Sequence, residues 1–246
     1  MTNDRPSRTC LISGISRGIG AATAKKLLMA GHNVLGLSRS TANPDNDWLP
    51  EHLRGNLTLT ECDVTDTAQL ENVIPQLQRE HPIDCVICNA GVGRFGSLEE
   101  FSLKQIQRLI NTNLLSHIYL CRLSLPSLKQ RERSDIVFIG SESALAGGRY
   151  GAVYSASKFG LRGFSQSLRH ECAGSNCHVG LINPGMVRTD FFETLEFEPG
   201  ANEDNALLSS DVADAVLQLI ESPDHAVIEE INVNPLKRVV NKKGKS

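Results

Sequence analysis

Tyr154 and Lys158 are the two side chains whose types and spacing could do chemistry together. They stand four residues apart, a spacing that brings side chains together on one face of a helix, and the apolar spacing up to Leu168 predicts such a helix. At about 4 Å and an effective dielectric of about 20, an ammonium favours a phenolate by roughly 4 kcal/mol. That energy lowers the pKa of a phenol by about three units. The pair could therefore supply a general acid or base near neutral pH, or it could be an exposed helix contact worth a few tenths of a kcal/mol.

The bulk properties limit the class of protein. The chain has 246 residues, 40% of them hydrophobic, which is enough for one large domain covering residues 1–246. A net charge of −3 gives no general basis for binding nucleic acid or anionic membranes, and no apolar run approaches the length of a bilayer span. The polar N-terminus lacks the apolar core of a signal peptide. We expect a soluble, cytoplasmic protein.

The seven cysteines are an odd number for a chain of this size, which favours reduced thiols over a disulfide framework. Cys85 and Cys88 have the spacing of a redox or zinc pair. They lie in an apolar run, however, where a strand would point them to opposite faces. No second pair with this spacing exists to complete a zinc site. We therefore predict a structural role for both cysteines and no metal site.

The elements that would position Tyr154 and Lys158 alternate between strands and helices. An apolar run at 9–13, a glycine-rich turn, a helical pattern at 21–30 and a second run at 33–38 form a strand–helix–strand unit. Residues 40–55 are polar and predict a loop with a short helical turn. The alternation continues with predicted strands at 56–62, 83–88, 135–139, 178–183 and 227–233 and with predicted helices at 68–80, 101–123, 154–168 and 211–221. About seven strands and six helices without a linker predict an α/β fold, a single-domain Rossmann fold with a doubly wound, seven-stranded parallel sheet and helices on both faces.

The glycine-rich turn is typical of a dinucleotide site. Its spacing is G-x-x-x-G-x-G, and glycine allows backbone to approach phosphates closely at a helix N-terminus. Tight strand-to-helix turns also use glycine for steric reasons alone. The candidate contacts in this turn are Gly14, Ser16, Arg17, Gly18, Ile19 and Gly20.

The end of the second strand indicates which dinucleotide would bind. An acidic residue at this place would accept the ribose hydroxyls of NAD, whereas this chain has Ser38 and Arg39. A guanidinium can pair with a 2′-phosphate, and Arg17 supplies a second cation nearby. Both arginines could also be solvated surface residues. The missing acid and the two cations favour NADP(H) over NAD(H).

Polar and small residues follow other predicted strands. Asp63 could accept a hydrogen bond from an adenine amino group, or it could be a helix N-cap or turn residue. Asn89 precedes Ala90 and Gly91, where small side chains would let backbone crowd a ligand. Since ligands collect at the carboxyl ends of parallel strands, these residues, Ser141 and Thr189 are expected to converge with Tyr154.

On these motifs the chain resembles the classical short-chain dehydrogenase/reductase family along nearly its whole length. The glycine motif runs from Ser13 to Gly20, with serine where threonine is usual. The Asn-Asn-Ala-Gly motif appears as Cys88-Asn89-Ala90-Gly91, without its first asparagine, a position that is mainly structural in the family.

The resemblance implies a role for each matching residue. Tyr154 would protonate a carbonyl oxygen or take the proton back in the reverse reaction, and Lys158 would lower its pKa and bind the nicotinamide ribose. Ser141 would hold the substrate oxygen, with Ser143 as a competitor, and Asn113 would position a water that leads protons to Lys158. The remaining cofactor contacts would come from Pro184, Gly185, Val187 and Thr189 around the carboxamide and from Asp63, Val64, Asn89, Ala90 and Gly91 toward the adenosine end.

The function predicted in this way is reduction of a ketone, aldehyde or 3-oxoacyl group to an alcohol with NADPH. The same site permits oxidation of an alcohol, and a catalytically silent regulator that senses dinucleotides could keep the fold. A sensor would not need the pair Tyr154 and Lys158. The resemblance further implies a homodimer or homotetramer built from the helices that carry Asn113 and Tyr154. We expect a small-molecule partner and neither nucleic acid nor membrane.

The segments 92–98, 142–153 and 190–210 would shape the substrate pocket, so the substrate itself is not predicted. Residues 190–210 are predicted to form a loop or lid that contains Phe191 and Phe192. Its acids would not attract an acidic carrier protein or a phosphorylated thioester, which favours a small neutral carbonyl compound; they are Glu193, Glu196, Glu198, Glu203 and Asp204. The basic tail at 237–246 is predicted to be a solvated, partly disordered end.

Overall fold

A seven-stranded parallel sheet forms the centre of the molecule. The structure, a computed structural model, describes residues 6–40 and 49–243. The strand order is β3-β2-β1-β4-β5-β6-β8, and every neighbouring pair is parallel. The strands are β1 (Thr9–Ser13), β2 (Asn33–Ser38), β3 (Leu57–Glu61), β4 (Ile83–Cys88), β5 (Ser134–Ile139), β6 (Cys177–Pro184) and β8 (Glu230–Val233). This order confirms the predicted doubly wound sheet.

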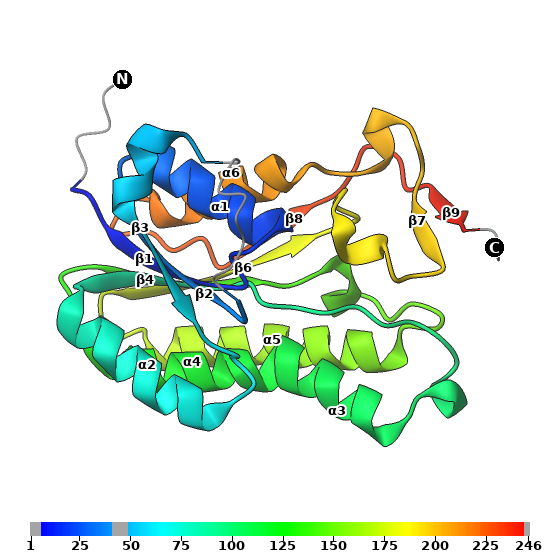
Figure 1. Cartoon of the computed structure of the whole chain (residues 1–246), viewed down its shortest axis with the longest axis horizontal. Coiled ribbons are helices and arrows are strands. Elements are labelled where there is room, and N and C mark those ends of the chain that lie inside the picture. The colour runs from blue at the N-terminus through cyan, green and yellow to red at the C-terminus, as the bar shows by residue number, and fades with distance from the viewer. Residues whose placement is uncertain (1–5, 41–48, 244–246) are drawn as a thin grey trace.

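Helices cover both faces of this sheet (Figure 1). One face carries α1 (Gly18–Met29) and α6 (Ser209–Ile220), and the other carries α2 (Thr67–Glu80), α4 (Ser116–Leu128) and α5 (Ala152–Glu171). Strands β1, β5 and β6 are buried along their whole length, as expected for parallel strands covered on both faces. The apolar core is therefore split into two layers, one on each side of the sheet.

Cys85 and Cys88 belong to these two different layers. Cys85 packs with residues of α1 and α6, and Cys88 packs with residues of α2, α4 and α5, which confirms that the two thiols point to opposite faces. All seven cysteines are free and buried. Within residues 6–40 and 49–243 no cluster of histidine, cysteine or acidic side chains could hold a metal ion, and no helix is long and apolar enough to cross a membrane.

The helical region predicted at 101–123 differs from expectation in two ways. It begins as α3 (Leu103–Ile110), where Ser102 and Gln105 form a reciprocal capping box. It then passes through a π-turn at Asn111–Leu115 before continuing as α4. Pro126, three residues beyond the predicted end of the helix, lies inside its last turn. The π-turn shifts the helix phase at Asn113, and such shifts are frequent at functional sites.

The carboxyl ends of the strands meet at one edge of the sheet. β5 and β6 pair Ile139 with Ile182, and the amide of Gly140 donates to the carbonyl of Ile182 at 2.7 Å. The residues that follow β5 and β6 therefore leave the sheet side by side. The glycine turn after β1 and the turn after β4 leave at the same edge, so the sheet topology brings the candidate residues together.

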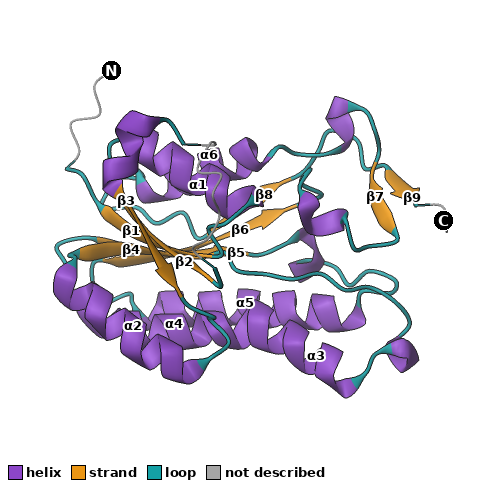
Figure 2. Cartoon of the chain, viewed as in Figure 1, coloured by secondary structure: helices purple, strands orange, loops and turns teal. Residues whose placement is uncertain are grey.

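The C-terminal segment forms a second, two-stranded sheet with the segment that precedes α6. We call residues 190–208 the lid. Within it, β7 (Phe197–Pro199) pairs antiparallel with β9 (Val240–Lys242), and Figure 2 shows both strands at one end of the molecule. Within the tail that was predicted to be partly disordered, Val240–Lys242 is therefore ordered by backbone pairing with the lid. Residues 244–246 and 41–48, which include part of the predicted polar loop, lie outside the described residues; the helical turn of that loop is a 3₁₀ turn at Glu51–Asn56.

Candidate active site

The glycine turn between β1 and α1 is shaped by close backbone approach. Gly14 and Gly18 have φ values of +71° and +57°, and a Cβ on Gly20 would lie 2.2 Å from the carbonyl oxygen of Gly14. Asn89 Nδ2 donates to the carbonyl oxygens of Ser13 and Gly14, both at 3.0 Å. Only glycine fits these positions, and the turn is tied to the end of β4. The side-chain amide of Asn89 is therefore used within the protein, and the contact predicted with adenosine would have to come from its other atoms.

The first turn of α1 has the features of a phosphate site. Its N-cap residue, Arg17, makes no side-chain capping hydrogen bond, and the first turn holds no acidic residue. Uncapped amides at a helix N-terminus, combined with a turn where side chains are excluded, provide donors for an anion. These residues fit a dinucleotide pyrophosphate, and the predicted candidates from Gly14 to Gly20, including Ser16 and Ile19, lie in this one turn.

Ser38 and Arg39 lie beside the glycine turn, as predicted. The amide of Gly14 donates to the carbonyl of Leu37 at 2.9 Å, so the end of β2 is in contact with the turn. Ser38 Oγ donates to the carbonyl of Ser40 at 2.6 Å. Arg39 is exposed, and no ion pair is formed by it with another described residue. Its guanidinium is available for a ligand that binds against the turn.

Asp63 is a turn residue, and the N-cap of α2 is Asp66 instead. Asp63 Oδ1 accepts hydrogen bonds from the amide and the hydroxyl of Thr65, at 2.9 and 2.7 Å. The backbone therefore leaves β3 in a tight turn, with Val64 buried beside it. A contact of Asp63 with adenine stays a prediction.

Thr189 faces the glycine turn from the end of β6. A Cβ on Gly18 would lie 3.5 Å from Thr189 Cγ2, and Arg17 forms an exposed ion pair with Asp190 at 3.6 Å. Thr189 Oγ1 donates to the carbonyl of Val187 at 3.3 Å and accepts from the amide of Phe191 at 3.3 Å. The segment after Pro184 and Gly185 thus lies over the turn.

Tyr154 and Ser141 form a hydroxyl pair at the same edge of the sheet. Tyr154 lies in the first turn of α5, Ser141 lies two residues after the end of β5, and the two side chains share a hydrogen bond. Ser143 contributes its backbone amide, which donates to Ser141 Oγ at 3.1 Å. The structure therefore brings Ser141 to the tyrosine and gives Ser143 a supporting place.

The expected lowering of the tyrosine pKa is wrong for this arrangement. Burial raises the pKa of Tyr154 to about 12; the hydrogen bond from Ser141 opposes this shift, and the carboxylate of Glu142 adds to it. Burial lowers the pKa of Lys158 to about 8. Lys158 Nζ donates to the carbonyl of Ile139 at 2.9 Å and lies 6.0 Å from the centroid of the Tyr154 ring. The ammonium is held by β5 instead of by the phenol, so desolvation decides both pKa values.

Asn113 connects three elements from its place in the π-turn. Its Oδ1 accepts from the amide of Val92 at 2.9 Å, and its Nδ2 donates to the carbonyl of Val92 at 3.0 Å and to Ser157 Oγ at 3.2 Å. The side chain is fully buried. It holds the segment after β4 against α5, next to Lys158. The role of Asn113 in positioning a water stays a prediction, and its side chain already has these protein partners.

A family model described as short chain dehydrogenase matches residues 8–199, the segment that contains every residue of the site described so far. The chain belongs to the short-chain dehydrogenase family. Its members are oxidoreductases that act on alcohol and carbonyl groups, and this chain shares that class of chemistry.

Individual members of the family are similar over most of the chain. Ketoacyl reductase HetN of Nostoc sp. is 32% identical over 96% of this chain and 82% of its own length. Sepiapterin reductase of Chlorobaculum tepidum is 30% identical over 92% of this chain and 95% of its own length. A solved alcohol dehydrogenase from the archaeon Thermococcus sibiricus, complexed with 5-hydroxy-NADP, is 25% identical with a TM-score of 0.84, covering 95% of this chain and 99% of that one.

Asn183 holds Ser141 of the short-chain dehydrogenase site in place, and this role was not predicted from the sequence. Its Oδ1 accepts from the amide of Ser141 at 3.4 Å, and its Nδ2 donates to Glu230 Oε1 and Asn232 Oδ1 at 2.8 and 2.9 Å. A Cβ on Gly140 would lie 2.3 Å from Asn183 Oδ1. An asparagine at the end of a fully buried strand was the signal that could have identified it. We call Asn113, Ser141, Tyr154, Lys158 and Asn183 the tyrosine cluster.

His117 is a second buried polar residue near this cluster. It lies one helical turn after Asn113 and is fully buried. Burial, and after it the charge of Lys158, lowers the pKa of His117 to about 3. The imidazole is therefore neutral at physiological pH and adds no charge beside Lys158.

The lid is held by backbone contacts and by the basic end of the chain. Arg188 donates to the carbonyls of Gly200 and Asn202, at 3.0 and 3.2 Å. Lys243 Nζ donates to the carbonyl of Phe192 at 2.5 Å, and Lys237 forms an ion pair with Asp204 at 2.7 Å. Asp204 and Glu198 thus pair with cations of the C-terminal segment, which weakens the prediction that acidic charge alone would exclude acidic carriers.

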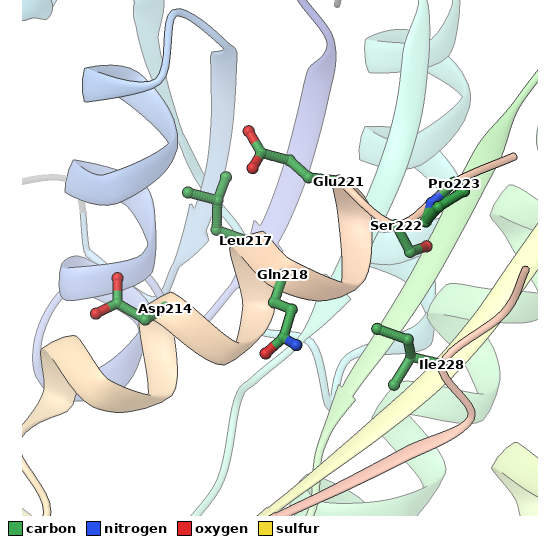
Figure 3. A pocket seen from close by; sticks show the side chains of 7 residues that line it. All are labelled: Asp214, Leu217, Gln218, Glu221, Ser222, Pro223 and Ile228. Carbon is green, nitrogen blue, oxygen red and sulfur yellow. The ribbon is translucent and has the colours of Figure 1, made fainter. Parts of the chain in front are cut away.

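A surface hollow of about 460 Å³ lies apart from this site, along α6 (Figure 3). Its lining residues are Asp214, Leu217, Gln218, Glu221, Ser222, Pro223 and Ile228. They come from α6 and from the segment between α6 and β8. This hollow offers no contact with Tyr154.

Proposed function

We propose that this protein is an NADPH-dependent reductase that converts a ketone, an aldehyde or a 3-oxoacyl group to an alcohol. The observation that supports this most strongly is the buried hydroxyl pair of Tyr154 and Ser141 beside Lys158, at the sheet edge that also carries the glycine turn. A proton donor and a phosphate cradle at one edge are the two parts that such a reaction needs.

The protein's side chains have separate roles in this proposal. Ser141 donates a hydrogen bond to the substrate carbonyl oxygen, and Tyr154 donates the proton that completes the alcohol. Because the pKa of Tyr154 is about 12, the phenol is protonated at pH 7 and can act as the acid. Lys158, with a pKa of about 8, is mostly an ammonium at pH 7, and its charge stabilises the phenolate that proton transfer leaves behind. When bound, the reduced nicotinamide supplies the hydride that adds to the carbonyl carbon.

The cofactor is held along the strand ends. The amides at the start of α1 bind the pyrophosphate, and Thr189 with the backbone of Val187 holds the carboxamide. Arg39 and Arg17 pair with the 2′-phosphate, which is the reason for preferring NADP(H) to NAD(H). The similar archaeal alcohol dehydrogenase was solved with 5-hydroxy-NADP, which supports the same choice here.

Oxidation of an alcohol is the second candidate, since the same groups operate in reverse and the similar archaeal protein is an alcohol dehydrogenase. A silent dinucleotide sensor is disfavoured because burying Lys158 with a lowered pKa costs stability that a sensor has no reason to retain. We further propose that the protein is a homodimer or homotetramer, as the family resemblance implies.

The cofactor claim is tested by exchanging a charge at Arg39. Arg39→Asp should raise KM for NADPH by about ten- to hundredfold, because a charge-assisted contact is lost and a repulsion is added, while KM for NADH falls. Arg79→Asp, on the exposed end of α2 away from the glycine turn, is the matched control and should leave both values within twofold.

The reaction itself is tested by following NADPH absorbance with a chemically diverse panel of ketones, aldehydes and 3-oxoacyl esters. The proposal predicts NADPH oxidation with at least one carbonyl compound and formation of the matching alcohol. Tight NADPH binding without oxidation across the whole panel would support the sensor instead.

A further inference from the structure

Four phenylalanines form an aromatic wall beside Tyr154. They are Phe95, Phe191, Phe192 and Phe197. The ring centroids of Phe95 and Phe191 lie 5.0 and 6.1 Å from that of Tyr154. Phe197 lies 5.0 Å from Phe95, and Phe192 lies 5.3 Å from Phe191. The chain has eight phenylalanines, so half of them gather at this one place.

The fold itself places these rings. Phe95 comes from the segment after β4 and lies against the start of α5, where a Cβ on Gly151 would be 3.4 Å from its ring. A Cβ on Gly93 would be 2.3 Å from the ring of Phe191, so a side chain at position 93 would displace that ring. The amide of Phe191 is bound by Thr189. Two separate segments of the chain are thus adapted to hold aromatic rings over the tyrosine.

The wall is only partly buried, unlike an aromatic core. Phe95, Phe191 and Phe197 keep intermediate exposure, whereas Phe138 in the sheet core is fully buried. The rings of Phe95 and Phe191, which pack against the ring of Tyr154, therefore keep part of their surface exposed. Offset and edge-to-face contacts between rings add stabilisation beyond the area they bury, so this surface favours a planar aromatic group over an aliphatic group of equal size.

The carboxylate of Glu142 disfavours a negatively charged group beside Ser141. Glu142 follows Ser141, and its carboxylate contributes, after burial, to the raised pKa of Tyr154, which means that its field reaches the phenol. Its partner, Arg238, lies 3.6 Å away and is mostly exposed, so the pairing is weak. An anionic group beside the carbonyl would be repelled.

We propose that the substrate carries an uncharged aromatic ring next to its carbonyl group, and that Phe95 and Phe191 select it. This inference rests on the function proposed above. The two rings act as specificity-determining residues: they contact the part of the substrate that does not react, and they contribute to the choice of substrate by about two- to tenfold for each ring.

The test compares acetophenone with cyclohexyl methyl ketone, which have the same number of carbon atoms and differ in aromaticity. The measured quantity is the ratio of their kcat/KM values with NADPH, because changes of this ratio between variants cancel the intrinsic reactivity of each ketone. Phe95→Leu and Phe191→Leu should each lower the ratio by about two- to tenfold. Phe164→Leu, whose ring packs against Phe138 in the core, is the control and should leave the ratio within twofold.

Two results would overturn the proposal while leaving carbonyl reduction intact. One is an unchanged ratio in both Phe95→Leu and Phe191→Leu. The other is a kcat/KM for ethyl acetoacetate, an uncharged 3-oxoacyl compound, more than tenfold above that for acetophenone.

Measurements of ketone binding test the aromatic site independently of the reduction reaction. Dissociation constants for both ketones are measured by NMR on Tyr154→Phe protein saturated with NADPH, which retains the ring but lacks the proton donor. Tighter binding of acetophenone, weakened by Phe191→Leu, supports the aromatic site even if the wild-type protein reduces neither ketone. Equal binding of the two ketones overturns it whatever the turnover.

Discussion

The tyrosine cluster and the lid differ in what holds them in place. In the cluster, buried side chains are bound by backbone groups and by one another, as in the contacts of Asn113 with Val92 and of Asn183 with Glu230. In the lid, an exposed strand pair and surface ion pairs such as Lys237–Asp204 make the connection. The two regions meet at Tyr154, whose ring packs against Phe191 of the lid.

This difference has an energetic meaning. A buried polar group that loses its partner costs about 1–3 kcal/mol, whereas an exposed ion pair contributes about 1 kcal/mol or less. The cluster is therefore a rigid part of the fold, and the contact between the lid and the C-terminal segment is the part that can open at small cost. An enzyme needs both, since the proton donor must be fixed and the substrate must enter.

The largest effect on stability is expected for Asn183→Ala in the cluster. The substitution leaves Ser141 N, Glu230 and Asn232 without their partner and should lower the free energy of unfolding by about 4 kcal/mol. Asn241→Ala, an exposed position in β9, is the matched control in the C-terminal strand and should change it by less than about 0.5 kcal/mol. Equilibrium denaturation in urea measures both. Equal losses would remove the distinction between the two regions.

A smaller effect should appear when the free energies of unfolding of the wild-type protein and of Lys158→Met are compared as a function of pH. The folded-state pKa of Lys158 is lowered from 10.5 to about 8, so between these values the unfolded chain binds more protons than the folded one. Stability conferred by position 158 therefore rises with pH in this window. The wild-type protein should gain about 3 kcal/mol relative to Lys158→Met between pH 7 and pH 10.5.

Unfolding of both proteins at several pH values measures this difference. In the difference between the two free energies of unfolding, the contributions of the thiols and of other titrating groups common to both proteins cancel. A difference that stays constant with pH would show that Lys158 is not desolvated by the fold.

The smallest effect on stability is expected when the C-terminal segment is removed after Leu236. The lid loses β9, the ion pair of Lys237 and the hydrogen bonds of Lys243, all at the surface, so the free energy of unfolding should fall by only about 1 kcal/mol. Hydrogen exchange should nevertheless become faster at Gly200, whose amide donates to the carbonyl of Val239. The amide of Val92, bound by Asn113, is the control and should exchange at its original rate. Faster exchange at both amides would mean that the lid and cluster open as one unit.

Features that depend on local patterns could be predicted from the sequence, whereas features that depend on the packed structure could not. The strand and helix alternation and the glycine turn are local patterns, and the sheet topology then brings Ser141 and Tyr154 together because parallel strands end at one edge. The prediction that Lys158 lowers the pKa of Tyr154 was wrong. Helical spacing places Lys158 near the tyrosine, but it does not show that the carbonyl of Ile139 accepts a hydrogen bond from the ammonium. Spacing gives proximity, whereas desolvation depends on the packed structure.

The pairing of the lid with the C-terminal strand β9 escaped prediction for another reason. The partner strand is far away in the sequence, and the composition of the tail, basic and polar, is the same as that of a disordered end. Likewise, Phe95 lies far in the chain from Phe191 and Phe197, so no local pattern joins them. Only the excess of phenylalanine near position 191, in a chain with 5% aromatic residues, was visible beforehand.

In the proposed reaction Tyr154 supplies the proton while other groups bind the cofactor. NADPH binding and NADPH oxidation are therefore measured in Tyr154→Phe, with the carbonyl compound that the wild-type protein reduces best. We expect a kcat lower by about a thousandfold and a dissociation constant for NADPH within threefold of the wild-type value. Retained turnover, or an equal loss of binding and turnover, would contradict this role of Tyr154.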